Sequence, residues 1–332
     1  MNPDLSLLPL CTEKTGWPWT EATPQLPETM PDGSPWPRIS IVTPSYNQGQ
    51  FIEETIRSVL LQGYPNFEYI IVDGGSTDGS VEIIKKYEPW LAYWVSEKDR
   101  GQSHAINKGI KRASGDILLW LNADDICLPC SFQIVVDAFR TNPTYSIVIG
   151  QAQLIDVYGR IVGQLHSQFN SWSEVITSPT NLIRQVSTFF SRGLFNELGM
   201  VDESLHIAMD TELLIRFTQH HKPLILNRFI TAFRTHASAK SRKQIIKGYE
   251  ESDRVRARFF PNRNTAAIYR KRSAAHWLKL ARSEELKISE RLICMIHAIR
   301  NQPAVIITRR FGSVLKKTCV DAMLPSFLTQ EC

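Results

Sequence analysis

The chain has 332 residues, of which 43% are hydrophobic and 21% are charged. These proportions are ordinary for globular proteins and exclude collagen-like, low-complexity and disordered classes. The formal net charge is +5, but it is unevenly distributed, since residues 1–237 carry 18 Lys/Arg and 25 Asp/Glu, whereas residues 238–317 carry 20 and 6. An acidic body, with a net charge of −7, is therefore followed by a strongly basic region with a net charge of +14.

Six cysteines in a chain of this length are too few for a disulfide scaffold. The first residues have neither the basic segment nor the long, unbroken apolar run of a secretory signal, so a secretory signal is not expected. No run of about 18 apolar residues predicts a transmembrane helix. The sequence therefore predicts a cytoplasmic protein, and the basic region leaves peripheral contact with the inner face of the membrane open.

Strands alternate with helices through the first half of the chain, after a proline-rich and irregular extension over residues 1–37. The predicted strands are 38–43, 67–72, 91–95, 117–121 and 146–150, and the predicted helices are 50–62, one from residue 80, 102–113 and 132–140. This alternation predicts an α/β fold, Rossmann-like, in which a mostly parallel open sheet carries helices on both faces.

The second half of the chain has a different pattern. Strands are predicted over 186–190 and 224–233 and a helix over 209–219, and from Ala239 the chain reads as helices with breaks near Pro261 and Pro303. We therefore predict an α/β domain over 38–237, with halves 38–150 and 151–237, followed by a basic helical C-terminal region over 238–332.

Polar side chains follow four consecutive predicted strands, at the point where each strand ends. They are Ser45, Tyr46 and Asn47, then Asp73, then Glu97 and Asp99, then Asp124 and Asp125. Because the carboxyl ends of parallel strands meet at one edge of the sheet, where ligands bind, these residues predict a ligand site there.

The segment Asn122-Ala-Asp-Asp125 has the clearest chemical signal. Adjacent carboxylates repel each other unless a cation is present, and oxygen ligands suit Mg²⁺ or Mn²⁺. The alternative is a turn whose Asp caps the next helix. Asp210, at the start of a predicted helix, is either a general base or an acid stabilised by the helix dipole. His236, after a predicted strand, is either structural or a metal ligand.

Several common signatures are missing from the sequence. There is no P-loop, GxGxxG, HExxH or GxSxG motif. Cys127 and Cys130 form a single CxxC pair with no second pair in reach, so a zinc site is not expected. The basic region lacks interleaved aromatic residues, so no nucleic-acid partner is expected. It is interpreted either as a solvated helical face or as a surface for anionic membrane.

Residues 38–240 resemble glycosyltransferase family 2, the inverting nucleotide-sugar transferases with the GT-A fold. Five segments carry the resemblance in the family's order. They are 41–47 (IVTPSYN), 70–79 (IIVDGGSTDG), 96–102 with 105–109 (SEKDRGQ and AINKG), 115–116 (GD) and 121–125 (LNADD).

The resemblance implies a role for each candidate residue. Residues that would bind the nucleotide-sugar donor are Thr43, Pro44, Tyr46, Asn47, Asp73, Asp99, Asn122 and Asp124. Asn122 to Asp125 matches the family's Asp-x-Asp motif, with Asn122 in place of the first Asp. Asp124 and Asp125 would hold Mg²⁺ or Mn²⁺, with His236 completing the metal site. Asp210 would be the catalytic base, and Met209 stands where the family has Glu.

The resemblance thus predicts an inverting hexosyltransferase of polysaccharide or glycan biosynthesis. Residues 38–150 would bind the nucleotide sugar and residues 151–237 a glycan or lipid-linked acceptor. The positive charge of residues 238–317, which begin almost where the resemblance stops, leaves an anionic membrane surface open as a further partner. Two alternatives stay open: a non-catalytic nucleotide-sugar-binding or membrane-surface relative, and a nucleotidyltransferase. The second is less favoured, because no basic residue follows the first strand before Arg57.

Overall fold

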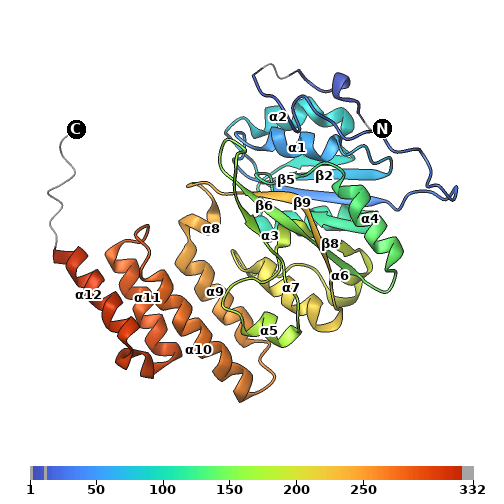
Figure 1. The fold of residues 1–332 in the computed structure, drawn as a ribbon. Helices are drawn as coiled ribbons and strands as arrows, with labels where there is room; N and C mark the ends of the chain where they lie inside the picture. Colours follow the sequence, from blue (N-terminus) through green and yellow to red (C-terminus); the bar gives the residue numbers. More distant parts are fainter. Residues whose placement is uncertain (1–2, 11–12, 324–332) are drawn as a thin grey trace, which may run out of the picture. The chain divides into compact units, whose positions relative to one another are not determined.

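The structure is a computed structural model that describes residues 3–10 and 13–323 (Figure 1). Residues 1–2 and 11–12 of the predicted extension, and 324–332 of the predicted helical region, lie outside the described residues. The chain forms two compact units. One is built from residues up to 170 together with 182–243, and the other from 171–181 together with the residues from 244 onward.

A mixed sheet forms the centre of the first unit. Its strands are β1 (Ile39–Ser45), β2 (Phe67–Asp73), β3 (Tyr93–Ser96), β4 (Ile117–Trp120), β5 (Ile126–Cys127), β6 (Ile147–Ile155), β7 (Ile161–Leu165), β8 (Thr188–Ser191) and β9 (Leu224–Arg234). They run in the order β3-β2-β1-β4-β8-β6-β9-β5, with β7 paired to β6. The pairs among β1 to β4 are parallel, as is β6 with β9, and the remaining pairs are antiparallel. The predicted α/β class is confirmed, with its parallel part concentrated in the first half of the chain.

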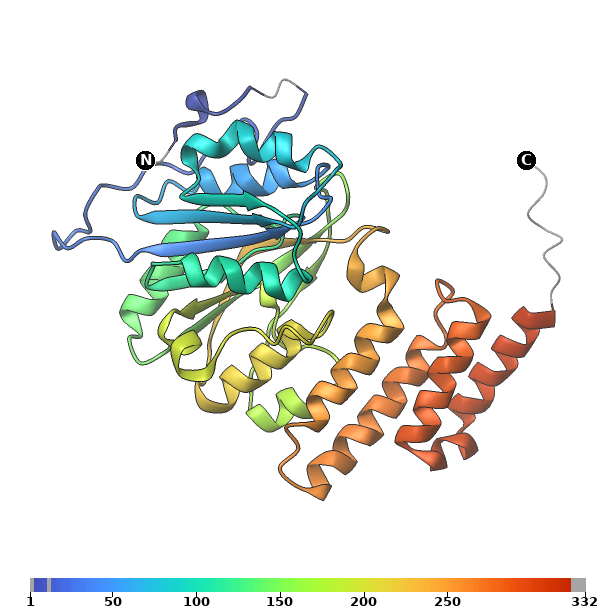
Figure 2. The same ribbon diagram turned by 180° about the vertical axis from the view of Figure 1, so that it is seen from behind.

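Helices cover both faces of this sheet (Figures 1 and 2). They are α1 (Ile52–Leu60), α2 (Ser80–Tyr87), α3 (Gln102–Arg112), α4 (Ser131–Thr141), α6 (Gly193–Leu198) and α7 (Met209–His220), and the short α8 (Lys240–Lys243) follows β9. Because side chains alternate along a strand, Ile39 and Ile41 pack in the core shared with α1 and α4. Val42 faces α3, so close that a Cβ on Gly109 would lie 2.2 Å from its Cγ1.

The strand register brings the carboxyl ends of β1, β2 and β3 together. Ser45 is paired with Asp73, and Asp73 with Ser96. Pro44 is tolerated in β1 because β4 ends beside Val42, whose carbonyl accepts a hydrogen bond from the Leu121 N–H. The nitrogen of Pro44 points to the same side, past the end of β4, where no ladder donor is needed. The sheet therefore has a polar edge that begins where the hydrogen-bonded strands stop.

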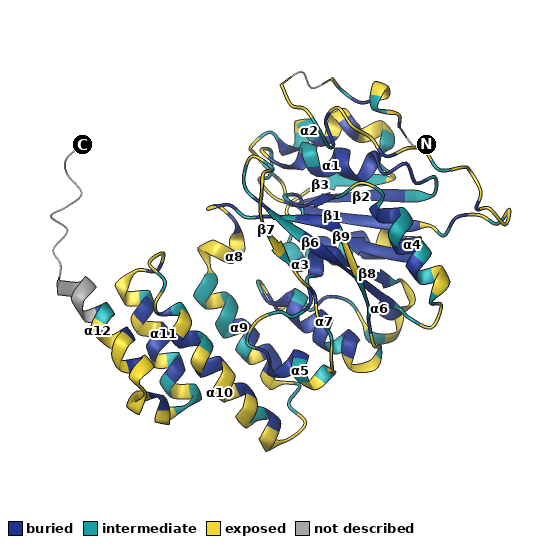
Figure 3. Cartoon of the chain, in the orientation of Figure 1, coloured by how far each residue is buried: buried dark blue, intermediate teal, exposed yellow. Residues whose placement is uncertain are grey.

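The second unit is helical, as predicted for the C-terminal region. Its helices are α5 (Trp172–Thr177), α9 (Ile245–Ala257), α10 (Arg263–Leu280), α11 (Ile288–Asn301) and α12 (Arg309–Met323), with a 3₁₀ turn at Pro303–Ile307. Asn262 caps α10 by accepting the Thr265 N–H at 2.9 Å. One face of each of the helices α10 and α11 is buried around Trp277, and the other is exposed (Figure 3). Within the described ranges, none of the helices combines the length and apolarity needed to span a bilayer.

Candidate active site

Asp73, the last residue of β2, is fully buried, and its carboxylate organises the loop that follows. Its two oxygens accept hydrogen bonds from the hydroxyls of Ser45, Ser76 and Ser96 and from the backbone N–H groups of Gly75 and Ser76, at 2.5–3.0 Å. Five donors fill the acceptor positions of a carboxylate. A contact with a nucleotide base therefore requires one donor, such as the Ser76 hydroxyl, to turn away.

Tyr46, Gly74 and Asp99 meet at the same edge. A Cβ on Gly74 would lie 2.7 Å from Oδ2 of Asp99 and 3.3 Å from Cδ2 of Tyr46, so only glycine fits between the two side chains. Asp99 also accepts the Gly101 N–H at 2.7 Å, which fixes the start of α3. Tyr46 keeps 63% of its surface exposed. Its ring and the Asp99 carboxylate are thus available to a flat, polar ligand such as a base.

The other residues of this edge that are predicted to bind the nucleotide sugar make contacts within the protein. Thr43 is buried and accepts a hydrogen bond from the Tyr69 hydroxyl at 3.1 Å, and Pro44 is also buried in β1. Asn47 adopts a left-handed backbone (φ 52°), and its Oδ1 accepts the Thr77 N–H at 3.0 Å. The Asn47 contact joins the loop after β1 to the loop after β2, whereas Thr43 and Pro44 are buried within β1.

The turn after β4 is tied to α3 through Asn122. Its Oδ1 accepts hydrogen bonds from Trp120 Nε1 at 2.9 Å and from Gln102 Nε2 at 3.0 Å. Its Nδ2 donates to Oδ2 of Asp125 at 3.1 Å. The amide therefore donates as well as accepts, which a carboxylate at this position could not do. Gln102 is the first residue of α3, so the turn and the start of that helix are fixed together.

Asp125 is fully buried, and its side chain points into the protein interior. Its Oδ1 accepts the backbone N–H of Arg234 at 3.0 Å, and its Oδ2 accepts from Asn122. Burial, together with the neighbouring charge of Asp124, raises the pKa of the Asp125 carboxyl well above its ordinary value. Both oxygens of Asp125 therefore have partners within the protein, and its contacts join the turn to β9.

Asp124 and His236 lie in contact. Oδ2 of Asp124 is 3.0 Å from Nε2 of His236, and Nδ1 of His236 is 2.6 Å from the Ser238 hydroxyl. The imidazole lies against Phe51, with 4.7 Å between ring centroids. The Asp124 side chain is 21% exposed, and that of His236 is 3% exposed. A carboxylate with one accessible face and an oriented imidazole are suitable as two ligands of a metal ion.

Arg234 supports the Asp124–His236 pair from the interior of the protein. Its guanidinium is fully buried, donates from Nε to the Asp124 carbonyl at 3.0 Å and forms an ion pair with Glu54 at 2.9 Å. In the part of the chain that the structure describes, no group of three or more His, Cys, Asp or Glu side chains is arranged as a metal site. Asp124 and His236 would therefore need further ligands from a bound molecule, as Mg²⁺ commonly takes from substrate phosphates.

Asp210 lies in the first turn of α7. Its Oδ1 accepts the Thr211 N–H at 2.7 Å, and its side chain is partly exposed. Met209 is buried, with 3% exposure, and so packs into the core at the position where the resemblance leads us to expect Glu. The positive end of the helix dipole stabilises the Asp210 carboxylate.

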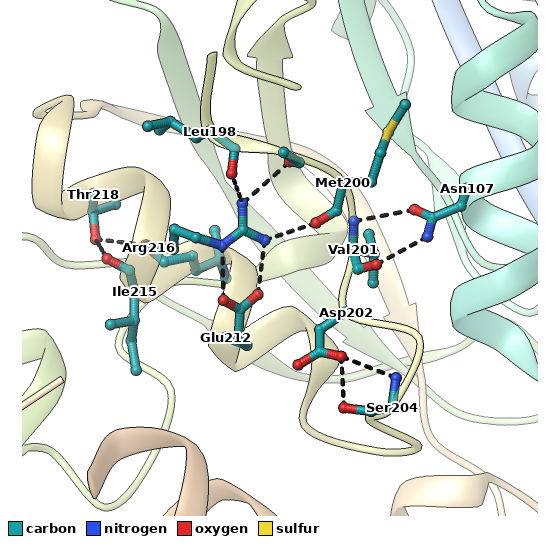
Figure 4. Close-up of polar contacts among 12 residues, drawn as sticks. Asn107, Leu198, Met200, Val201, Asp202, Ser204, Glu212, Ile215, Arg216 and Thr218 are labelled. Atoms are coloured by element: carbon teal, nitrogen blue, oxygen red, sulfur yellow. Dashed lines mark hydrogen bonds and ion pairs between the residues drawn. The ribbon is translucent and has the colours of Figure 1, made fainter. Parts of the chain in front are cut away.

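A polar network fastens the segment before α7 to that helix (Figure 4). Arg216 binds Glu212, one turn earlier, through two hydrogen bonds of 2.7 and 2.8 Å. The same guanidinium donates to three consecutive carbonyls, those of Leu198, Gly199 and Met200. A planar side chain with five donors can make all these bonds at once only in one position. Arg216 therefore fixes residues 198–200 against α7.

The other side of this segment is held by α3. Asn107 exchanges two hydrogen bonds with the backbone of Val201, at 2.9 and 3.0 Å (Figure 4). Ser103 donates to the Leu205 carbonyl at 2.9 Å. A continuous chain of contacts thus runs from Asn122 through α3 to the helix that carries Asp210. Asn107 and Arg216 were not predicted from the sequence as site residues, although the spacing of Glu212 and Arg216 on a predicted helix is a signal for an ion pair.

The first unit thus has an α/β nucleotide-binding architecture with its polar site at the strand ends, which defines a GT-A type of fold. Residues 40–198 match the family model described as glycosyl transferase family 2. The chain is 30% identical, over 203 residues, to an uncharacterized glycosyltransferase of Mycobacterium tuberculosis, covering 60% of this chain and 76% of that protein. The chain therefore belongs to glycosyltransferase family 2, and the predicted enzyme class, a nucleotide-sugar-dependent glycosyltransferase, is confirmed.

One further relative and one solved structure are informative. Poly-beta-1,6-N-acetyl-D-glucosamine synthase of Staphylococcus epidermidis is 28% identical over 181 residues, covering 50% of this chain and 42% of that protein. Among solved structures, residues 1–349 of S. aureus TarS superpose with a TM-score of 0.58 at 19% identity, covering 86% of this chain and 88% of that one. This likeness shows a shared fold.

Proposed function

We propose that the protein is an inverting, metal-assisted glycosyltransferase that moves a sugar from a nucleotide-diphosphate sugar to an acceptor hydroxyl. The observation that carries this proposal is the contact between Asp124 and His236 at the end of β4, beside the polar edge formed by Asp73 and Asp99. A pair of side chains suited to a metal ion, next to a polar surface with an exposed aromatic ring, suits a nucleoside diphosphate.

We propose that the base of the donor lies on Tyr46, between the loops that carry Asp73 and Asp99. Tyr46 offers an exposed aromatic face, and the Asp99 carboxylate offers an acceptor to the base's N–H groups. Asp73 could accept from the base only if a present donor, such as the Ser76 hydroxyl, turned away. S. aureus TarS has been solved in complex with UDP and with UDP-GlcNAc. UDP-sugars are therefore the first donors to test.

Asp124 and His236 would hold Mg²⁺ or Mn²⁺ together with the diphosphate of the donor. The metal supplies positive charge that neutralises the diphosphate as it leaves. Asp125, predicted as a third metal ligand, contacts Asn122 and Arg234 and would position the turn rather than bind the ion. Asn122 contributes the amide that fixes the turn against α3.

Asp210 would act as the general base. An alcohol is a weak nucleophile at neutral pH, so a carboxylate must take its proton as the oxygen attacks the anomeric carbon. Attack opposite the leaving diphosphate inverts that carbon in one displacement and needs no covalent intermediate with the protein. Arg216 and Asn107 support the segment that leads to this helix and would position Asp210.

The acceptor is proposed to be a glycan or a lipid-linked glycan in polysaccharide synthesis, bound beside residues 151–237. The named activity of the Staphylococcus epidermidis relative, a polysaccharide synthase, supports this class of acceptor. The direct test incubates the protein with UDP-, GDP- and dTDP-sugars and Mn²⁺ and measures release of the nucleoside diphosphate. Binding without any release or transfer across these donors would favour the non-catalytic alternative.

A further inference from the structure

The helical unit exposes an apolar face on α11. Ile288, Leu292, Ile293 and Ile296 are each between 37% and 48% exposed. Their spacing places them on one side of the helix, away from Cys294 and Ala298, whose side chains are buried. We refer to these four side chains as the α11 stripe. The helix thus has one apolar face inside the unit and a second one outside it.

Exposed apolar side chains are concentrated in this region. Of the fourteen large hydrophobic residues that are exposed in the described part of the chain, eight lie between residues 268 and 315. Directly after α11, Ile306 and Ile307 are 50% and 88% exposed. Single exposed aliphatic residues are normal on a protein surface, but a group of them on adjacent elements indicates a surface that contacts another molecule.

Cations bracket the apolar residues along the chain. Lys287 precedes the stripe, Arg300 lies one turn after Ile296, and Arg309 and Arg310 follow Ile307; all four are exposed. Residues 263–317 carry 13 Lys/Arg and 3 Asp/Glu. Glu284 pairs with Lys317, and Glu290 accepts the Lys287 N–H. With 13 basic and 3 acidic residues, the formal charge of this segment is strongly positive.

We infer that the α11 stripe inserts into the surface of an anionic lipid bilayer, with the flanking cations on the headgroups. Exposed aliphatic residues beside Lys and Arg are the composition of helices that lie in a membrane interface. A second copy of the chain fits less well, because a symmetric contact would bring two strongly basic segments together and four side chains are too few for a stable interface. The inference does not depend on the proposed glycosyl transfer.

The test measures binding of the full chain to sedimented vesicles at low salt. Phosphatidylcholine vesicles containing about one third phosphatidylglycerol are compared with pure phosphatidylcholine. The stripe variant Leu292→Ser/Ile296→Ser is compared with Leu7→Ser/Leu10→Ser, which alters two exposed apolar side chains of the N-terminal extension, outside the proposed catalytic domain. We expect binding to the anionic vesicles only, at least a 10-fold weaker partition for the stripe variant, and no change for the Leu7/Leu10 variant.

Three outcomes would overturn the inference. One is an absence of binding to anionic vesicles at low salt. Another is equal binding by the wild type and the stripe variant, which would indicate that charge alone attracts the lipid. The third is a loss of self-association in the stripe variant by analytical ultracentrifugation without a change in vesicle binding, which would assign the face to a second copy. Release of nucleoside diphosphate, measured without vesicles, should be equal in all variants. A failure of the proposed enzyme activity can therefore be distinguished from a failure of membrane binding.

Discussion

Nε2 of His236 lies 3.0 Å from Oδ2 of Asp124, although 112 residues separate them in the chain. The contact joins the end of β4 to the end of β9, and the buried Arg234 holds both segments by bonding to the Asp124 carbonyl. The chain segments next to Asp124 and His236 do not by themselves bring the two side chains together. The pair is therefore a product of the sheet order, in which β9 reaches the turn after β4.

Replacement of His236 by Ala should weaken metal binding. Loss of one of two protein ligands should raise the Mn²⁺ concentration needed for half-maximal binding, with UDP present, by about 10-fold or more. Isothermal titration of Mn²⁺ measures this without requiring turnover. His221→Ala is the matched control, because His221 pairs with Glu197 at the far end of α7. Equal Mn²⁺ affinity in the two variants would remove His236 from the metal site.

Replacement of Asp210 by Asn should abolish transfer but preserve donor binding. An amide cannot take the acceptor proton, so the rate of transfer should fall by about 10²- to 10⁴-fold. The donor dissociation constant, measured by thermal shift, should stay within about 2-fold of the wild-type value. Asp202→Asn is the control, because its amide oxygen can still accept the Ser204 N–H. A near-native rate for Asp210→Asn would assign the base elsewhere.

Replacement of Arg216 by Lys should lower the turnover number more than it changes donor affinity. Lysine keeps the charge but cannot bind Glu212 and three carbonyls together, so the start of α7 should shift. A displacement of about 1 Å at a reacting group costs up to about 100-fold in rate. We therefore expect kcat to fall at least 10-fold with the donor KM unchanged.

The Glu212 variants separate positioning from a general loss of stability. Glu212→Gln keeps one hydrogen bond to Arg216 and should retain more activity than Glu212→Ala. If the melting temperature and donor KM of the Arg216 and Glu212 variants change in parallel with kcat, the network has only a structural role.

The positions of the strand ends could be predicted from the sequence more accurately than the contacts that the residues at those ends make. β1, β2 and β4 are apolar runs that stop at turn residues, so their ends and the acids that follow could be located. β5 has two residues and β7 is mostly exposed, so neither has a periodic signal. The contacts of Arg216 with main-chain carbonyls also leave no trace in the sequence, because any residue supplies a carbonyl.

Asp125 is the clearest case in which residue type alone does not predict the role of a side chain, because its carboxylate is buried. Adjacent aspartates in a sequence predict a metal site with two carboxylate ligands, and the distinction between them depends on which way each side chain points. The structure directs Asp124 toward His236 and Asp125 toward the Arg234 backbone. That difference follows from the pairing of β5 with β9, which residue spacing along the chain does not predict.

Glu68 joins three segments at the amino ends of the strands, the ends opposite the site. It lies on β2, accepts hydrogen bonds from Ser40 of β1 and from Ser114, which precedes β4, and pairs with Arg38 at 3.1 Å. Burial alone would raise the pKa of Glu68, but the hydrogen bonds from Ser40 and Ser114 and the charge of Arg38 outweigh it and lower the pKa below its ordinary value of 4.5.

Because the pKa of Glu68 is lower in the folded than in the unfolded protein, its ionised form stabilises the fold. This contribution is complete above pH 4.5 and is lost as the pH falls through the folded-state pKa. Glu68→Gln should therefore reduce the free energy of unfolding by roughly 1–3 kcal/mol at pH 7. The difference from the wild type should shrink as the pH falls below 4.5, as measured by urea unfolding. Glu82→Gln, at an exposed position of α2, should show neither effect; a difference for Glu68→Gln that stays constant from pH 7 to pH 3 would show that the lowered pKa does not contribute to stability.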